Sequence, residues 1–493
     1  MSIEHWVSVC LGPLAAWILI SGLDDLFISL VWIFAKREFL WPAPQEVAER
    51  PERRIAVFVP LWHEHRVIGQ MLEHNLAGIQ YEKYEVFVGV YPNDEQTREA
   101  VKKAARQDDR VHIATVPHDG PTSKGDCLNA IYRRMLAHEA RDGVRFDVII
   151  THDAEDLIHP ESLRLINWHM PDYQMVQVPV LALPTGLREL THGLYCDEFA
   201  EYQSKDIPVR QQLGGFLPSN GVGTGFDRNA LEHLADLRGG QMFDPACLTE
   251  DYETGYRLHQ QGCRQIFLPL RFDSQRPMAT REYFPRQWAA AVRQRSRWVA
   301  GIALQGWVNH GWNFGTRQAY WFWRDRKGLV GNLLSPVVSL LFLLGLMGYR
   351  SHDPGILPVL AATAAISLLQ TGCRMWASAR VYGWRFASGV PVRMVWGNVV
   401  NCLATLAAVG QFTSAAVHRE SVAWRKTEHD YPVHARPRLG ELLVRMRILP
   451  VRDLEAALRT KPSSLRLGEH LMRLEKISPE HLELALSRQE SGD

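Results

Sequence analysis

The sequence has no closely spaced pair of cysteines and no excess of charge of one sign. Its seven cysteines are scattered with no CxxC pair, which argues against a disulfide framework or a zinc ribbon and fits a reducing compartment. Its 55 lysines and arginines almost balance 54 aspartates and glutamates, so the charge gives no reason to expect a nucleic-acid partner. A chain of 493 residues is too long for one ordinary domain, and we expect two or three units.

Residues 38–325 also lack any long uncharged run, whereas the N-terminus has one. Residues 6–35 are apolar apart from Asp24 and Asp25, and a basic pair follows them. A cleavable signal peptide would carry basic residues before its apolar run. We therefore interpret residues 1–37 as a retained membrane anchor, with the chain that follows in the cytosol. The two carboxylates are expected either to face other helices or water, or to mark a break in the helix.

Three further uncharged runs lie beyond the central region, each near the ~20 residues needed to cross a bilayer. They are residues 329–349, 355–373 and 394–417, within a unit that we place at residues 326–425. The first two form a predicted helical hairpin. The third carries Asn398, Asn401 and Thr405 on one helical face. We predict three spans and an interface helix packed on the enzyme, against an alternative with four spans that would place the C-terminus outside.

Short β-branched runs alternate with helix-forming segments in the central region. The predicted strands are residues 54–61, 84–91, 111–116 and 146–152, and the predicted helices are residues 64–79, 95–106 and 124–141. This alternation predicts an α/β fold with a doubly wound, mainly parallel sheet. Ligands of such sheets sit at the carboxyl ends of the strands, where the sequence places Glu64, Asp94 and the polar run at residues 152–156.

Two groups of carboxylates stand out along this region. Asp153, Glu155 and Asp156 follow a hydrophobic strand, and carboxylates at a strand tip suit Mg²⁺, which completes its shell with substrate phosphates. A solvated acidic turn would carry the same residues. Glu250 and Asp251 open a predicted helix. They either interact with the helix dipole or supply, through Asp251, a general base for an acceptor hydroxyl.

The segment 293–301 (RQRSRWVAG) combines arginines with a glutamine and a tryptophan. Arginine suits bidentate contact with phosphate, and tryptophan can stack on a sugar or a base. A basic amphipathic helix near a membrane would look similar. The segment gains meaning from its position, because it follows the acidic strand tip and the Glu-Asp pair in that order along the chain.

In this order and spacing, the motifs resemble those of the family-2 processive glycosyltransferases, which include bacterial cellulose, chitin and hyaluronan synthases. The resemblance covers residues 50–310. It implies a GT-A-like fold, Asp251 as catalytic base beside Glu250, and a metal ion, Mg²⁺ or Mn²⁺, on Asp153 and Glu155. It also implies nucleotide-sugar contacts from Pro60, Glu64, Asp94, Lys124, Asp153, Gln294, Arg295, Arg297 and Trp298. The stretch 216–228 resembles the family's glycine-rich acceptor loop, with acceptor contacts from Gly223, Thr224 and Gly225.

Two details of the sequence indicate which group within this family the chain resembles. The metal motif reads D-A-E-D followed by His159-Pro160, and His63 stands where the family usually has asparagine. Combined with the N-terminal anchor, this variant looks closest to the phage adsorption protein B group, which are inner-membrane glycosyltransferases tied to exopolysaccharide production.

Residues 436–493 contain a tandem repeat. Residues 438–461 align without gaps to residues 466–489, and Arg-Leu-Gly-Glu opens both copies. Such repetition indicates a duplicated unit; two hairpins packed only for stability would explain the spaced leucines but not the repeated Arg-Leu-Gly. The pattern resembles the MshEN-type cyclic-di-GMP domain. That resemblance implies ligand contacts from Arg438, Leu439, Gly440, Leu443, Leu454, Leu458, Arg466, Leu467, Gly468, Leu471, Leu482, Leu486 and Gln489.

The expected function is therefore an inverting, metal-dependent transfer from a UDP-sugar that builds an exopolysaccharide and is activated by cyclic-di-GMP. The protein is expected in the bacterial inner membrane, with its catalytic and C-terminal domains in the cytoplasm. Its partners would be the donor, the growing glycan, the messenger and the lipid bilayer. Three membrane spans are few for a channel that exports a glycan on its own, so an outer-membrane partner is expected to assist the export. The alternatives are single addition to a lipid-linked acceptor, or a catalytically idle phage receptor or scaffold.

Overall fold

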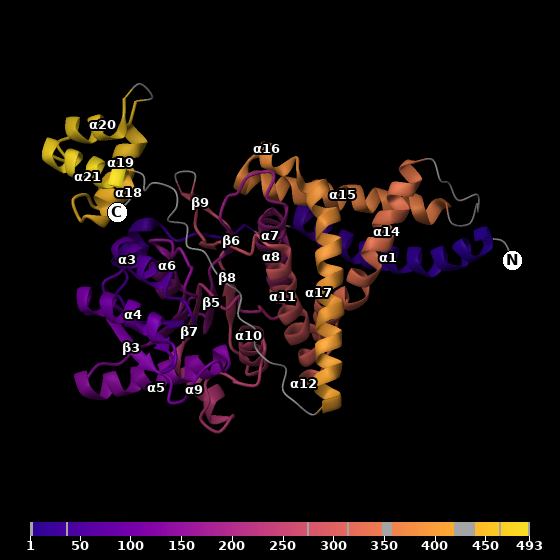
Figure 1. The fold of residues 1–493 in the computed structure, drawn as a ribbon, viewed down its shortest axis with the longest axis horizontal. Helices are drawn as coiled ribbons and strands as arrows, with labels where there is room; N and C mark the ends of the chain where they lie inside the picture. The colour runs from indigo at the N-terminus through magenta and orange to yellow at the C-terminus, as the bar shows by residue number, and fades with distance from the viewer. Residues whose placement is uncertain are drawn as a thin grey trace.

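The structure, a computed structural model, describes residues 3–35, 38–273, 276–312, 315–347, 357–418, 439–462 and 465–491. Figure 1 shows an α/β domain on one side, a group of long helices on the other, and a small helical unit at the C-terminal end of the chain. The predicted hairpin link at residues 350–354 lies outside the described residues.

A seven-stranded sheet forms the centre of the α/β domain, in the order β3-β2-β1-β4-β7-β5-β8. In that order its strands are Val111–Thr115, Tyr84–Val90, Ile55–Pro60, Val148–Thr151, Thr224–Asp227, Met175–Gln177 and Gln265–Phe267. The first four are parallel to one another, whereas β7 runs antiparallel to both of its neighbours. The α/β class and the mainly parallel sheet are thus confirmed, with one reversed strand that the sequence did not indicate.

Each of the four predicted strands forms, and the intervening helices pack on both faces of the sheet. The helices of this domain are α2 (Pro44–Glu49), α3 (Ile68–Gly78), α4 (Glu95–Gln107), α5 (Lys124–Asp142), α6 (Ser162–His169), α7 (Leu190–Glu201), α8 (Ile207–Gln212), α9 (Arg228–Asp236), α10 (Glu250–Gln260), α11 (Trp288–Trp298), α12 (Gly306–His310) and α13 (Thr316–Arg326). Four small strands form two separate two-stranded sheets: β6 (Val180–Ala182) pairs with β11 (Thr280–Glu282), and β9 (Phe272–Asp273) pairs with β10 (Arg276–Pro277). Two apolar clusters, centred on Val57 and Phe58 of β1, fill the two sides of the sheet.

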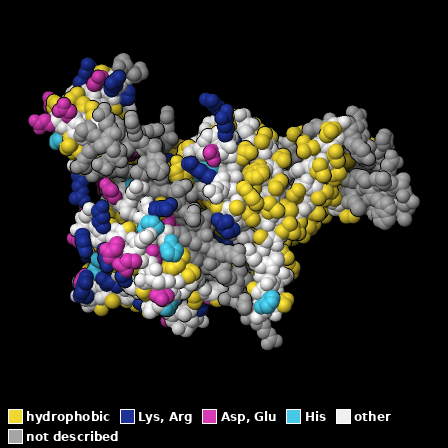
Figure 2. Space-filling model, viewed as in Figure 1, with side chains coloured by type: hydrophobic (Ala, Val, Ile, Leu, Met, Phe, Trp, Pro, Cys, Tyr) yellow, Lys and Arg dark blue, Asp and Glu magenta, His cyan; other side chains and the backbone are white. Residues whose placement is uncertain are grey.

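The long helices are α1 (Ile3–Phe34), α14 (Gly328–Leu346), α15 (Leu357–Tyr382) and α17 (Val390–His418), and the short α16 (Trp384–Ala387) joins the last two. Within the described part of the chain, the stretches Gly12–Phe34 and Val390–Ala415 are long and apolar enough to cross a membrane. Exposed apolar side chains cover this side of the molecule in Figure 2. They include Phe27, Ile33, Leu340 and Leu368, the last of which is 73% exposed. A continuous apolar surface of this kind is typical of a membrane-facing region.

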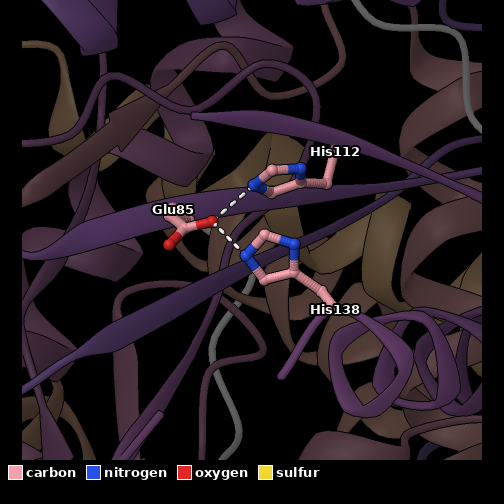
Figure 3. Close-up of side chains that lie close together, drawn as sticks. All are labelled: Glu85, His112 and His138. Carbon is pink, nitrogen blue, oxygen red and sulfur yellow. Dashed lines mark hydrogen bonds and ion pairs between the residues drawn. The ribbon is translucent and has the colours of Figure 1, made fainter. Parts of the chain in front are cut away.

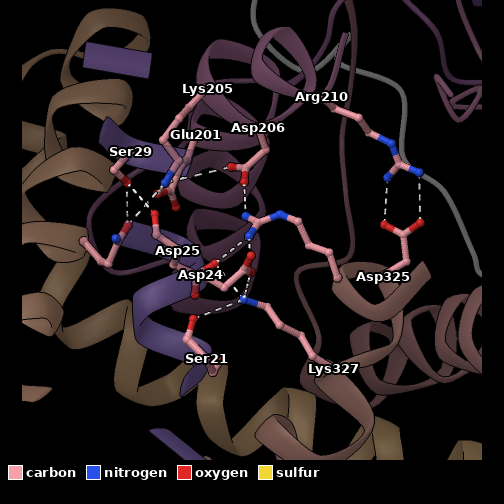
Figure 4. A network of polar contacts seen from close by, with 12 residues as sticks. Ser21, Asp24, Asp25, Ser29, Glu201, Lys205, Asp206, Arg210, Asp325 and Lys327 are labelled. Carbon is pink, nitrogen blue, oxygen red and sulfur yellow. Dashed lines mark hydrogen bonds and ion pairs between the residues drawn. The ribbon is translucent and has the colours of Figure 1, made fainter. Parts of the chain in front are cut away.

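Helix α1 is continuous through Asp24 and Asp25, so the predicted break is wrong and the alternative, carboxylates that face other helices, is confirmed. The Lys327 ammonium donates to Asp24 at 2.7 Å and to Asp25 at 2.8 Å. Arg324 also pairs with Asp24, and it donates to Asp206 at 2.6 Å. Figure 4 shows how Asp24 and Asp25 of α1, Asp206 of the π-helical segment η1 (Tyr202–Asp206) and Lys327, which directly follows α13, converge. The network joins the N-terminal helix to the α/β domain.

Helix α17 packs against α14, α11 and α7 and runs across the direction of α1 in the view of Figure 1. Its polar face makes contacts within the protein. Asn398 donates to Ser339 at 3.0 Å, and Asn401 accepts from Arg295 at 2.7 Å. Helix α17 therefore packs on the α/β domain, while its predicted place at the membrane interface and the number of membrane spans stay predictions.

The C-terminal unit consists of α18 (Leu439–Arg445), α19 (Val451–Thr460), α20 (Leu467–Arg473) and α21 (Pro479–Ser491), and α18 packs against α3. The two repeats have matching contacts. A Cβ on Gly440 would meet Leu454 at 2.8 Å and Leu467 at 3.2 Å, and one on Gly468 would meet Leu482 at 2.6 Å and Leu439 at 3.1 Å. Each glycine therefore accepts a leucine from its own copy and one from the other. Arg438 and the side chain of Gln489 lie outside what the structure describes.

The buried ion pair between α7 and α17 generates a stability prediction. Arg393 donates to Asp197 at 2.6 and 2.9 Å, and both side chains are 1% exposed. Arg393→Leu should lower stability by about 3–5 kcal/mol, because it leaves the Asp197 carboxylate buried without its cation. Melting curves of the detergent-solubilised protein would measure the loss. The exposed Arg385→Leu on α16 is the control, and equal melting temperatures for the two variants would contradict the prediction.

Candidate active site

A cavity of about 940 Å³ opens where the carboxyl ends of β1, β2 and β4 meet. This is the edge at which α/β sheets bind ligands. The predicted residues that line the cavity are Pro60, Glu64, Lys124, Asp153, Glu155, Glu250, Asp251, Gln294, Arg297 and Trp298. The structure thus brings together residues from all three motifs, although they lie far apart along the chain.

Lys124, the first residue of α5, is the central cation of the cavity. Its ammonium lies 2.6 Å from Asp153 and 3.9 Å from Glu250, and it donates to the carbonyl oxygen of Gly221 at 3.5 Å. Burial would lower the pKa of Lys124, yet the charges of Asp153 and Glu250 raise it above its ordinary value. The ammonium is therefore charged and placed where an anionic substrate group would meet it.

Glu250 and Asp251 occupy the first turn of α10, as predicted. Burial and the charge of Asp251 raise the pKa of Glu250 to about 7, against the opposing charge of Lys124. Burial likewise raises the pKa of Asp251, whose carboxylate accepts the Tyr252 N–H at 2.7 Å. Raised carboxyl pKa values are typical of groups that accept a proton during catalysis. Both acids lie in the first turn, where the helix dipole also favours a carboxylate, and Thr249 holds the cap position without a side-chain cap hydrogen bond.

The carboxylates in the turn after β4 differ in whether they face the cavity. Asp153 and Glu155 line the cavity. Asp156 is fully buried, lies 2.6 Å from His152 Nδ1 and accepts the Asp153 N–H at 3.0 Å. Asp156 therefore shapes the turn that presents Asp153. The alternative of a solvated acidic turn does not hold for Glu155 and Asp156, which are only 3% and 0% exposed.

The carboxylates of the cavity fit a divalent cation. Asp153, Glu155, Glu250 and Asp251 line the cavity together with Lys124. Mg²⁺ and Mn²⁺ prefer oxygen ligands and bind through one or two carboxylates plus substrate phosphates. Asp153, whose side chain is 32% exposed, is the best placed of the four to share an ion with a bound diphosphate.

Three residues after β1 and β2 are predicted to contact the nucleotide sugar. Two of them, Pro60 and Glu64, line the cavity. Asp94 is instead the N-cap of α4 and accepts the backbone N–H groups of His63 at 2.6 Å and of Thr97 at 3.4 Å. Its carboxylate therefore holds the loop after β1 in place, and a nucleoside contact for it stays a prediction.

Trp62 and Tyr91 also line this part of the cavity, with ring centroids 5.2 Å apart at 85°. Sequence reasoning missed both aromatic residues. Tyr91 directly follows β2 and Trp62 lies two residues after the end of β1, which is the signal that could have identified them. A pair of aromatic rings at this position offers a stacking surface for a base or a sugar.

Within the 293–301 motif, Gln294, Arg297 and Trp298 line the cavity. Arg295 is instead buried, donating to Glu198 and to Asn401 at 2.7 Å each and lying 4.3 Å from the ring centre of Tyr195. Arg295 therefore connects α11 with α7 and α17 rather than facing the cavity. The π-helical segment η2 (Val299–Gln305) follows directly, and such segments occur frequently at functional sites.

The predicted acceptor residues do not line the cavity of the described chain. Thr224 and Gly225 belong to β7, and Thr224 is fully buried with its hydroxyl 2.7 Å from Gln177. A side chain at Gly223 would meet Thr280 at 2.5 Å. The residues just before them, Pro218, Ser219, Asn220 and Val222, line the cavity instead. The loop prediction thus identifies the correct loop, but its cavity-facing part lies slightly upstream.

The cavity continues between the long helices. Its further lining comes from Ser21 of α1, Asn332 and Ser335 of α14, Gln370 of α15 and Asn398 of α17. These are polar residues on helices whose outer faces are apolar. The catalytic carboxylates and the long helices therefore share one continuous space.

Such a site on such a sheet is that of a glycosyltransferase of the GT-A class. The family model described as glycosyltransferase-like family 2 matches residues 51–301. The chain is 35% identical over 523 aligned residues to bacteriophage adsorption protein B of Escherichia coli K12, covering 97% of this chain and 70% of that protein. The same values hold for bacteriophage N4 adsorption protein B of Escherichia coli O157:H7. This chain belongs to glycosyltransferase family 2.

Among solved structures, the chain is similar to a mannosyltransferase from Pyrobaculum calidifontis in complex with GDP-Man and Mn²⁺. The two share 18% sequence identity with a TM-score of 0.49, over 78% of this chain and 97% of the other.

Gly221 provides a test of the catalytic geometry. It has φ +75, and a Cβ there would lie 2.6 Å from Asp251 Oδ2 and 3.3 Å from Lys124 Nζ. Gly221→Ala should lower kcat by roughly ten- to a hundredfold, because it displaces both groups. Gly143→Ala is the matched control, since Gly143 has φ +65 but nothing within 4 Å of its Cβ position. Steady-state kinetics would separate the two, and equal losses would show that backbone strain alone is responsible.

Proposed function

We propose that the protein is a membrane-bound inverting glycosyltransferase that uses a UDP-sugar to extend an exopolysaccharide. The observation that carries the proposal is the single cavity shared by Lys124, Asp153, Asp251 and Trp298. Sugar transfer from a nucleotide requires a cation that binds the diphosphate, a carboxylate that binds a metal ion, a general base and an aromatic ring that stacks on the sugar. The 35% identity to adsorption protein B across nearly the whole chain supports an enzyme that keeps this architecture.

The proposed mechanism begins with the donor diphosphate near Lys124 and Arg297. The Asp251 carboxylate takes the proton of an acceptor hydroxyl. That oxygen attacks the anomeric carbon on the face opposite the diphosphate, so one C–O bond forms as the bond to UDP breaks and the configuration inverts. A bound Mg²⁺ or Mn²⁺, held by Asp153 and Glu155, would stabilise the negative charge of the leaving diphosphate. Trp298 supplies a surface for the sugar.

The path of the glycan is proposed from the extent of the cavity. Its continuation among α1, α14, α15 and α17 supports an acceptor that reaches from the catalytic carboxylates toward the membrane. The exposed apolar surface of these helices supports contact with a membrane. The proposal of a cytoplasmic catalytic domain at the inner membrane draws on the basic pair that follows the N-terminal apolar run. An outer-membrane export partner would carry the product onward.

Regulation by cyclic-di-GMP is proposed for the C-terminal unit. The reciprocal contacts of Gly440 and Gly468 with leucines of both copies support a two-fold arrangement suited to a nearly symmetric dinucleotide. Arg466 is exposed at the head of α20, where it could reach a phosphate or a guanine. The packing of α18 against α3 supports communication with the catalytic domain.

Asp251→Asn should abolish sugar transfer, with kcat reduced by at least about 10²–10⁴-fold, because the acceptor proton then has no base. Release of UDP from a panel of UDP-sugars by purified membranes would measure it, with Asp244→Asn outside the cavity as control. Retained turnover in Asp251→Asn would remove Asp251 as the base, and no turnover in the wild type with any donor would contradict the function itself.

Arg466→Ala should weaken cyclic-di-GMP binding by about tenfold or more, because it removes a charge-assisted hydrogen bond. Basal transfer should stay unchanged while activation by the messenger is lost. Calorimetric titration and the UDP-release assay would measure the two effects. Arg473→Ala, exposed on the same helix, should leave both unchanged; an equal effect of the two variants would contradict a specific role for Arg466.

A further inference from the structure

Two histidines and a glutamate converge at the amino-terminal edge of the sheet. Glu85 lies near the start of β2, His112 lies on β3, and His138 lies on α5 (Figure 3). Glu85 Oε2 lies 2.5 Å from His112 Nε2 and 2.8 Å from His138 Nε2. One ligand atom from each residue lies within 4.8 Å of the other two.

The three groups lie beside aromatic rings and are partly shielded from solvent. The rings of Phe87 and Phe146 lie 5.6 and 6.1 Å from the His138 ring. The side chains of Glu85, His112 and His138 are 18%, 12% and 5% exposed, so solvent still reaches the group. A small ion can therefore enter, while the ligand side chains are held by packing.

Outer partners orient the ligands. Asp142 Oδ2 lies 3.2 Å from His138 Nδ1, on the side of the ring away from Glu85. Arg141 donates to both Asp142 oxygens at 2.6 and 2.9 Å, and it lies 3.1 Å from the same histidine nitrogen. Arg54 lies 3.7 Å from the second oxygen of Glu85. A carboxylate behind a histidine, which fixes its ring and tautomer, is a regular companion of metal-binding histidines.

We infer that Glu85, His112 and His138 form a binding site for a divalent ion of the zinc class, separate from the catalytic metal site. Two imidazoles and one carboxylate are a set that zinc accepts with a water as fourth ligand. Mg²⁺ prefers oxygen ligands throughout. In the ion-free protein the Nε2 atoms of both imidazoles face one Glu85 oxygen. On binding, each Nε2 gives up its proton and a neutral ring carries its one proton on Nδ1 instead, where Asp142 can accept it from His138; the ligand atoms then move slightly apart.

The site is remote from the chemistry. Glu85 lies near the start of β2, whereas Tyr91, which lines the catalytic cavity, follows its other end. At ~3.3 Å per residue these positions are about 20 Å apart. The ion would fasten edge strand β3 to β2 and α5, and so would stabilise the half of the sheet that carries the nucleoside side of the cavity.

Zinc binding to the purified full-length protein tests the inference. Zinc competition against a chromophoric chelator should give about one tight site per chain. His112→Phe, which keeps an aromatic ring beside Phe87, should weaken zinc binding by about tenfold or more. Glu85→Gln, which keeps a hydrogen-bond acceptor, should weaken it similarly. His118→Ala, at an exposed histidine, is the control.

Asp153→Asn separates the two metal sites, because it alters the catalytic carboxylate and leaves the histidines intact. It should retain the tight zinc site, and zinc should raise its melting temperature as in the wild type but not that of His112→Phe. Zinc binding that is lost in Asp153→Asn and kept in His112→Phe would overturn the inference, as would equal affinity in the wild type and both triad variants.

Discussion

The ammonium group of Lys124 is the charge on which the arrangement of the active site depends. It lies against Asp153 from the turn after β4 and near Glu250 from the start of α10. Without a cation at that point, the carboxylates of one buried cavity would repel one another in a low-dielectric setting. The same ammonium reaches the Gly221 carbonyl, so it positions the loop before β7 as well. One side chain thus holds together three segments that meet only in the folded protein.

Much of the fold could be read from the sequence because its strands are short, β-branched and regularly separated by helices. Periodicity identifies such elements well, and the carboxyl ends of parallel strands must meet at one edge. Asp153 and Glu64 lie two and four residues after the ends of β4 and β1, so their place at the cavity could be predicted. Trp298 and Asp251 depended on motif order rather than on any physical signal in their own neighbourhoods.

The remaining assignments could not be made because a motif gives the residue type and not the direction of its side chain. Arg295 and Arg297 are two positions apart on α11, about 200° around the helix, so only one of them can face the cavity. Asp94 carries the same carboxylate as Asp153, yet it is used to cap a helix. Thr224 falls within a strand that reverses in the sheet, a pairing between distant segments that no local pattern encodes.

The ion pairs of Asp24 have a consequence for how the protein is made. Arg324 follows Asp24 by 300 residues in the chain. At ~5–20 residues per second, the ribosome needs roughly 15–60 s to synthesise the basic partners after the acidic pair has emerged. During that interval α1 carries two carboxylates in an apolar helix with no cations to receive them. Helix α1 can therefore reach its final packed position only late in biogenesis. This happens after the end of the catalytic domain has been translated and has folded against α1.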